Sequence, residues 1–152
     1  MTDVTLRPAE PKDSEQLGRL AFGLVKLHHE WDPERFIQLT DPNAPKYGWW
    51  LSSRGNGDPK TIVLVAVRPD PDGEKICGYT YARMEDKDWN DLRDPCGMLH
   101  DIFVDPNCRR RGIARRLALA TFAELEKKGA PFIVLKTAAK NEAAQAFFAS
   151  IG

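Results

Sequence analysis

Five arginines and one glycine lie where a predicted strand leads into a predicted helix. The segment has the sequence MLHDIFVDPNCRRRGIARRLALA over residues 98–120. Between Asp105 and Arg116, five arginines stand against one aspartate, so the local charge is five minus one, or +4. The first N–H groups of a helix lack intrahelical partners and bind anions, and Gly112 has no side chain to keep a phosphate from the backbone. The pattern predicts a phosphate-binding turn.

Two familiar phosphate-binding motifs do not fit this turn. The Walker A motif requires GxxxxGK followed by Ser or Thr, and the dinucleotide fingerprint requires GxGxxG. The chain contains neither of them. What it contains is RRRGIA at residues 109–114, which has the form [Q/R]xxGx[G/A].

That form is the signature of the GNAT superfamily of acyl-CoA-dependent N-acyltransferases, and the chain resembles this family at two further places. The strand before the turn resembles the family's fourth strand, with LHDIFVDP at residues 99–106. The last predicted helix resembles the family's NxxAxxFY helix, with NEAAQAFF at residues 141–148. The resemblance is strong over residues 98–152 and is compatible with residues 4–83.

The resemblance implies an α/β fold (α+β in some schemes) and acetyl-CoA as cofactor. In this fold helices flank a mixed, mostly antiparallel central sheet. The pyrophosphate of coenzyme A would lie on the N–H groups of residues 110–114, and the pantetheine arm between two diverging strands, 98–104 and 132–136. An N–H near Phe103 or Val104 would polarise the thioester carbonyl. The cofactor-binding residues it implies are Ile102, Phe103, Val104, Arg109, Arg110, Arg111, Gly112, Ile113, Ala114, Arg115, Asn141, Ala144, Phe147 and Phe148.

Two neighbouring residues on the strand are the candidates for acid–base work. Transfer requires an amine that has lost its proton. His100 stands where many family members carry glutamate. Because histidine titrates near neutral pH, we predict that His100 is the base. The alternative is that His100 is a half-buried strand residue bonded to a neighbouring carbonyl. Asp101 is the second candidate, with a structural role or charge placement beside the amine as alternatives. Strand alternation predicts two faces, one with Met98, His100, Ile102 and Val104, the other with Leu99, Asp101 and Phe103.

The chain departs from the family pattern at two points. Family members commonly carry tyrosine where this chain has Phe148, and a phenylalanine cannot protonate the leaving thiolate. The family also continues after the NxxAxxFY helix with two more strands, whereas this sequence ends at Gly152. We expect either a truncated sequence or a wall supplied by another subunit.

The remaining sequence predicts the elements that position these residues. Apolar residues at three- and four-residue steps predict helices over about 11–29, 109–128 and 141–150. Apolar or alternating runs predict strands over 4–7, 61–67, 75–83, 98–104 and 132–135, with 61–67 buried on both faces. The order is β, α, a further short helix near 34–39, β, β, β, α, β, α.

Residues 31–56 contain three prolines and an aromatic group, and we expect them to be irregular and close to a pocket. In the family this region shapes the acceptor site; core packing or a dimer surface is the alternative. His28 and His29 could line the same site or simply favour the negative end of a helix dipole. The aromatic group consists of Trp31, Tyr47, Trp49 and Trp50.

Composition limits the class of protein. With 152 residues and 42% hydrophobic content, we expect a single domain over 1–152. Lys plus Arg (22) equals Asp plus Glu (22), so nothing in the overall charge favours nucleic acid or an anionic membrane. The N-terminus lacks a signal-peptide pattern, and the three cysteines are not closely spaced, so we expect a cytoplasmic protein with reduced thiols and no metal.

The sequence therefore predicts an N-acetyltransferase of the acyltransferase class EC 2.3.1, moving acetyl from acetyl-CoA to a primary amine of a small molecule or a protein. A homodimer is the expected assembly. One rival is a noncatalytic acyl-CoA-binding module, motivated by Phe148 and the absent strands. Another is a nucleic-acid binder that uses the arginine cluster, which lacks interleaved aromatic residues.

Overall fold

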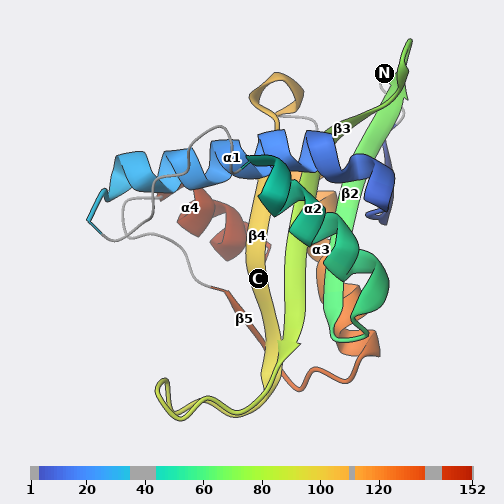
Figure 1. Cartoon of the computed structure of the whole chain (residues 1–152). Coiled ribbons are helices and arrows are strands. Elements are labelled where there is room, and N and C mark those ends of the chain that lie inside the picture. Colours follow the sequence, from blue (N-terminus) through green and yellow to red (C-terminus); the bar gives the residue numbers. More distant parts are fainter. Residues whose placement is uncertain (1–3, 35–43, 110–111, 136–141, 152) are drawn as a thin grey trace.

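A five-stranded sheet carries helices on both of its faces (Figure 1). The computed structural model describes residues 4–34, 44–109, 112–135 and 142–151. In chain order the elements are β1 (Thr5–Pro8), η1 (Pro11–Asp13), α1 (Ser14–Trp31), α2 (Ala44–Gly57), β2 (Thr61–Asp70), β3 (Gly73–Glu85), β4 (Cys96–Val104), η3 (Pro106–Cys108), α3 (Ile113–Lys127), β5 (Ile133–Leu135) and α4 (Glu142–Ser150).

The strands lie side by side in the order β1-β2-β3-β4-β5. The first four are antiparallel to their neighbours, and β5 is parallel to β4. Residues 61–67 of β2 are all buried, as their continuous apolar run predicts. The predicted mixed, mostly antiparallel sheet flanked by helices is therefore confirmed.

The predicted order of elements is also the observed one, but the second helix lies later in the chain than we expected. Residues 44–57, predicted to be irregular, form the 14-residue helix α2. Pro45 does not prevent this because it lies in the first turn, where a residue needs no N–H for an intrahelical bond. The expected short helix near 34–39 falls almost entirely outside the described residues.

Two apolar clusters fill the two sides of the sheet. Helices α1 and α2 cover one face, where Leu17, Leu51 and Tyr79 are fully buried. Helix α3 covers the other face, where Leu117 and Leu125 are fully buried. Figure 1 shows α1 and α2 crossing in front of the strands and α3 behind them. The sheet is therefore buried on both sides over most of its length.

Two buried polar contacts fix α1 and α3 against the sheet. Arg7 of β1 donates two hydrogen bonds, of 2.8 and 2.9 Å, to the Asp13 carboxylate just before α1. The Arg7 guanidinium lowers the pKa of Asp13 in spite of its burial. On the other face, the hydroxyls of Thr80 and Thr121 are 2.7 Å apart, and Thr121 also donates to the Leu117 carbonyl. These bonds hold both helices in a defined position.

Among the described residues, no helix combines the length and the apolar character that crossing a bilayer requires.

Helices α1 and α2 approach each other closely at Gly48. A Cβ placed on Gly48 would overlap the Ser14 carbonyl oxygen and lie 2.6 Å from the Gly18 nitrogen, both of which are backbone atoms of α1. Backbone atoms cannot move aside as a flexible side chain can. The crossing that places α2 over the sheet therefore depends on a glycine at this position.

We predict that Gly48→Ala destabilises the protein by about 1–3 kcal/mol, the range of an overpacked core substitution. Gly57→Ala is the matched control in the same helix, because its new Cβ would meet nothing within 4 Å. That substitution should leave stability unchanged or raise it by up to about 0.5 kcal/mol. Urea denaturation of the two variants measures the difference, and equal midpoints would contradict the close crossing.

Candidate active site

Strand β4 contains one residue more than its partner at His100. Tyr81 of β3 pairs with Asp101, and the next residue, Ala82, pairs with Leu99. His100 therefore has no counterpart on β3, which defines a β-bulge. A bulge shifts the alternation of a strand by one residue, so side chains and backbone groups on its two sides no longer follow one pattern.

The bulge overturns the two faces predicted by simple alternation. Leu99 was predicted to share a face with Phe103. It packs instead with Val104 in the apolar cluster beneath α3, here called the α3-side cluster. Phe103 lies in the opposite cluster, beneath α1. His100 lies on that same side, because its ring stacks on Tyr81 with the centroids 5.0 Å apart and the planes at 21°. His100 and its neighbour Asp101 are thus brought to one side of the sheet.

The backbone of β4 also changes its direction of hydrogen bonding. The Asp105 N–H donates to the Cys77 carbonyl of the strand β3 at 2.8 Å, and the Phe103 carbonyl lies against Gly78 of β3. Alternation then directs the N–H and C=O groups of Ile102 and Val104 away from β3. This corrects the prediction that Phe103 supplies main-chain groups to a cofactor on the other side of β4.

Strand β5 pairs with β4 over all three of its residues, before the part of β4 that contains Ile102 and Val104. The pairing runs from Gly97 opposite Ile133 to Leu99 opposite Leu135, and among the described residues it stops there. Figure 1 shows β5 leaning away from β4 toward α4. Leu135 is also the last residue described in this segment, so the divergence of the two strands beside Ile102 and Val104 stays a prediction.

Helix α3 begins after an exposed glycine that provides no side-chain cap. Gly112 is exposed and has a φ of 72°, a left-handed conformation that favours glycine, and it offers no side chain to cap the helix. The first intrahelical bond runs from the Arg116 N–H to the Gly112 carbonyl at 3.1 Å. The first turn has no acidic residue. The N–H groups of Ile113 and Ala114 therefore have the partial positive charge of an uncapped helix start.

The three arginines of the turn that the structure describes differ in their contacts. The Arg109 Nε donates to the Val104 carbonyl at 3.1 Å, and its guanidinium lies 5.5 Å from the Phe103 ring centroid. Arg116 donates to the Val4 carbonyl at 2.9 Å, and Arg115 is exposed. Arg109 thus braces the end of β4 beside the turn. Arg110 and Arg111 lie outside the described residues.

A buried carboxylate lies on the acceptor side of β4. The Asp101 Oδ2 accepts hydrogen bonds from the hydroxyls of Tyr47, at 2.6 Å, and Tyr79, at 3.0 Å. Burial raises the pKa of Asp101, although the two hydroxyls lower it in part and the charges of His100 and His28 lower it as well. Burial also raises the pKa of both tyrosines, so they remain protonated donors. Sequence reasoning did not identify Tyr79 because a core tyrosine on a strand has no distinguishing pattern.

The predicted base has a partner that the sequence did not indicate. The His100 Nε2 lies 2.7 Å from the Glu85 Oε1, at the end of β3. Both side chains are partly exposed, 31% for His100 and 22% for Glu85. The alternative in which the histidine bonds a neighbouring carbonyl is not what the structure shows. Glu85 could not be selected from the sequence, because its contact with His100 depends on the register between β3 and β4 across the bulge.

The last helix, α4, places Phe148 on the α3 side of the sheet. The rings of Phe147 and Phe148 meet edge to face with centroids 5.1 Å apart, and Phe148 packs against the α3-side cluster. Ala144 is half-buried, and Asn141 lies outside the described residues. The side chain that replaces the family's tyrosine thus belongs to apolar packing.

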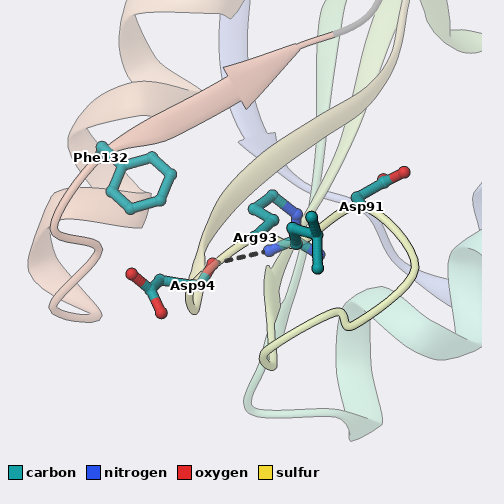
Figure 2. Close-up of a pocket in the computed structure, with 5 residues that line it drawn as sticks. Asp91, Arg93, Asp94 and Phe132 are labelled. Carbon is teal, nitrogen blue, oxygen red and sulfur yellow. Dashed lines mark hydrogen bonds between the residues drawn. The ribbon is translucent and has the colours of Figure 1, made fainter.

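A separate hollow of about 540 Å³ lies at the other end of β4. Figure 2 shows Asp91, Arg93, Asp94 and Phe132 around it, just before β4 and β5 begin. The Arg93 guanidinium is bound to the Asp94 carbonyl, at 2.9 Å, and to the Cys96 sulfur, at 3.0 Å. Since Gly112 follows the opposite end of the strand, this hollow is not adjacent to the turn that we predict to bind phosphate. All three cysteines are buried and free, as predicted.

Comparisons with known proteins give a family match and a shared fold. The family model for the acetyltransferase (GNAT) family matches residues 24–152. A mycothiol acetyltransferase of Nocardioides sp. is 26% identical over 154 residues, which cover 98% of this chain and 49% of that relative. The chain therefore spans about half the length of the curated relative it matches.

Solved structures share the same fold. A mutant of the BH1408 protein from Bacillus halodurans superposes with a TM-score of 0.77 at 24% identity, covering 97% of this chain and 91% of that one. The aminoglycoside N-acetyltransferase AAC(6')-Iy in complex with CoA superposes with a TM-score of 0.71 at 20% identity, covering 100% and 88%. At these identities the likeness establishes the fold.

We predict that Asp101 titrates above the usual range of aspartate, and that Tyr47→Phe raises its pKa further because a donor that stabilises the carboxylate is lost. Titration of the Asp101 carboxyl carbon by NMR measures both effects. Tyr81→Phe is the control, since the Tyr81 hydroxyl is not one of the two donors to Asp101. An Asp101 that titrates as an exposed aspartate would contradict the cluster.

Proposed function

The chain belongs to the acetyltransferase (GNAT) family, and we propose that it is an acetyl-CoA-dependent N-acetyltransferase acting on a primary amine by direct transfer. One observation carries the proposal. The main-chain groups of Ile102 and the N–H of Val104 face away from β3, and β4 leads through η3 to the uncapped start of α3 at Gly112.

The described residues fit coenzyme A. The pyrophosphate needs backbone N–H donors without a competing carboxylate, and the first turn of α3 supplies them. The pantetheine arm can form strand-like hydrogen bonds with the outward-facing groups of Ile102 and Val104. Arg109 braces this edge by its bond to the Val104 carbonyl. The proposed roles of Arg110, Arg111 and Asn141 concern residues outside the described part of the chain.

Acetyl-CoA supplies an acetyl thioester whose carbonyl carbon accepts the amine nitrogen. In the overall transfer the new C–N bond replaces the C–S bond, so that an ammonium ion and acetyl-CoA give an amide, the free thiol and one proton. The chain therefore needs a group that removes a proton from the amine. A backbone N–H that donates to the thioester oxygen would stabilise the negative charge that develops there, and the Val104 N–H can fill this role.

The side of β4 that faces α1 and α2 provides a group that can accept the proton and a carboxylate that can bind the amine. We assign the proton-accepting role to His100, which lies at the bulge on the same side as Asp101. Asp101 uses only its Oδ2 for the two tyrosine hydroxyls, which leaves Oδ1 able to accept a hydrogen bond from the substrate nitrogen. The aromatic rings of Tyr47, Trp50 and Tyr81 pack beside these groups.

The acceptor proposed here is a small-molecule amine. The relatives named as mycothiol and aminoglycoside acetyltransferases support this class over a protein amine. A cytoplasmic location and a homodimer remain part of the proposal.

A noncatalytic acyl-CoA-binding protein is the second candidate, favoured by Phe148. Its ring packs against the α3-side cluster and carries no proton to give to the thiolate. Coenzyme A thiolate is a good leaving group, so water can supply that proton, and we therefore prefer the enzyme.

Release of free thiol from acetyl-CoA, measured across a panel of primary amines, separates the two candidates. The enzyme should release thiol in an amine-dependent manner. Tight binding of coenzyme A, seen by calorimetry, with no thiol above background for any amine would favour the binding protein.

We predict that His100→Ala lowers turnover by about 100-fold, the lower end of the range for general acid–base catalysis, and removes the acidic limb of the pH–rate profile. Added imidazole should restore part of the rate to the variant because it can enter the space left by the side chain. Turnover and a pH profile equal to those of the wild type would exclude His100 as the base.

A further inference from the structure

We propose that Glu85 is a positioning residue that binds the His100 ring through Nε2 and leaves Nδ1 as the atom that accepts the proton. The inference rests on the proposed function and extends it to a residue on a different strand. Glu85 acts through His100 and is not placed in contact with the substrate.

The ring of His100 is held on two sides. The Glu85 Oε1 lies 2.7 Å from its Nε2, the distance of a strong hydrogen bond to a carboxylate. The Tyr81 ring stacks on its face with a centroid distance of 5.0 Å and an interplanar angle of 21°. The stacking fixes the plane of the imidazole, and the carboxylate fixes its rotation within that plane. Both side chains are less than one-third exposed.

The bulge makes this contact available. On β3, Tyr81, Arg83 and Glu85 alternate along the strand and therefore share one face. Regular alternation from Asp101 would turn His100 to the opposite face. The extra residue in β4 instead turns it onto Tyr81 and toward Glu85, although Glu85 itself pairs with Cys96.

The carboxylate is itself anchored. The second oxygen of Glu85, Oε2, lies 3.4 Å from the Arg83 Nη1, and the Arg83 Nη2 lies 3.7 Å from the Asp58 carboxylate. Arg83 thus holds Glu85 in place and leaves Oε1 for the histidine. A carboxylate that only decorated the surface would not need this support.

The chemistry of imidazole sets the consequence. A neutral histidine carries one N–H and one lone pair, and the hydrogen bond made by one nitrogen decides which has which. A carboxylate only accepts, so the N–H is on Nε2 and the lone pair is on Nδ1. Among the described residues, Nδ1 of His100 has no hydrogen-bond partner. When the amine N–H bond breaks, the proton forms an N–H bond at Nδ1, and Glu85 stabilises the resulting imidazolium.

The charged groups near this ring come from three elements. Strand β3 contributes Glu85 and Arg83, strand β4 contributes Asp101, and α1 contributes His28, whose charge reaches Asp101. Of these, only Glu85 bonds to the imidazole. A change at Glu85 therefore acts on His100 more directly than a change at the others.

Nitrogen-15 NMR of His100 tests the geometry without any substrate. We expect the wild type to show the tautomer with the proton on Nε2. Glu85→Gln keeps an oxygen that can accept the bond and should keep this tautomer, whereas Glu85→Ala should give a mixture of both. Asp86→Asn is the matched control, because that neighbouring carboxylate is 83% exposed and pairs with Lys60. Identical spectra for wild type and Glu85→Ala would overturn the proposal.

Kinetics test the role in transfer. With an amine that the wild type acetylates, Glu85→Gln should lower kcat about tenfold, leave KM unchanged and move the acidic limb of the profile to lower pH, because a neutral amide stabilises the imidazolium less. An unchanged limb would refute the role of Glu85. If no amine is acetylated, the proposed function fails, and the spectra still decide whether Glu85 orients the ring.

Discussion

One extra residue in β4 reverses the alternation of that strand halfway along its length. Before His100, the strand directs backbone groups to β5 and pairs with it; after His100, the groups of Ile102 and Val104 face the same side, where the described pairing has ended. The same extra residue places the His100 ring on Tyr81. In the proposed function, the bulge thus leaves one edge of β4 for a ligand with a strand-like backbone and one face for proton transfer.

The two halves of the site rely on different physical means. The cofactor side depends on backbone groups, namely the outward-facing amides of β4 and the uncapped start of α3 at Gly112, with Arg109 as a brace. Such groups accept any acyl thioester with little help from side chains. The acceptor side depends on side chains, with a buried Asp101 under two tyrosine hydroxyls and a His100 bound to Glu85. Specificity for the amine is therefore expected to arise on the acceptor side.

The sequence predicted the elements whose burial is regular and missed the features that depend on register. The run 61–67 and the periodicity of residues 109–128 gave β2 and α3 because apolar spacing reflects burial directly. Helix α2 was missed because Pro45 resembled a break, whereas it stands in a first turn. The bulge at His100, and with it the contact to Glu85, could not be predicted, since both faces of β4 carry apolar residues and the sequence therefore does not mark where the alternation shifts.

The central claim is that coenzyme A binds along the outer edge of β4 and on the first turn of α3. Titration of the isotope-labelled protein with coenzyme A, followed by backbone amide NMR, tests it most directly. The account predicts the largest shifts at Ile102, Val104, Gly112, Ile113 and Ala114. Shifts centred instead on Arg93 and Phe132, around the hollow at the opposite end of β4, would contradict it.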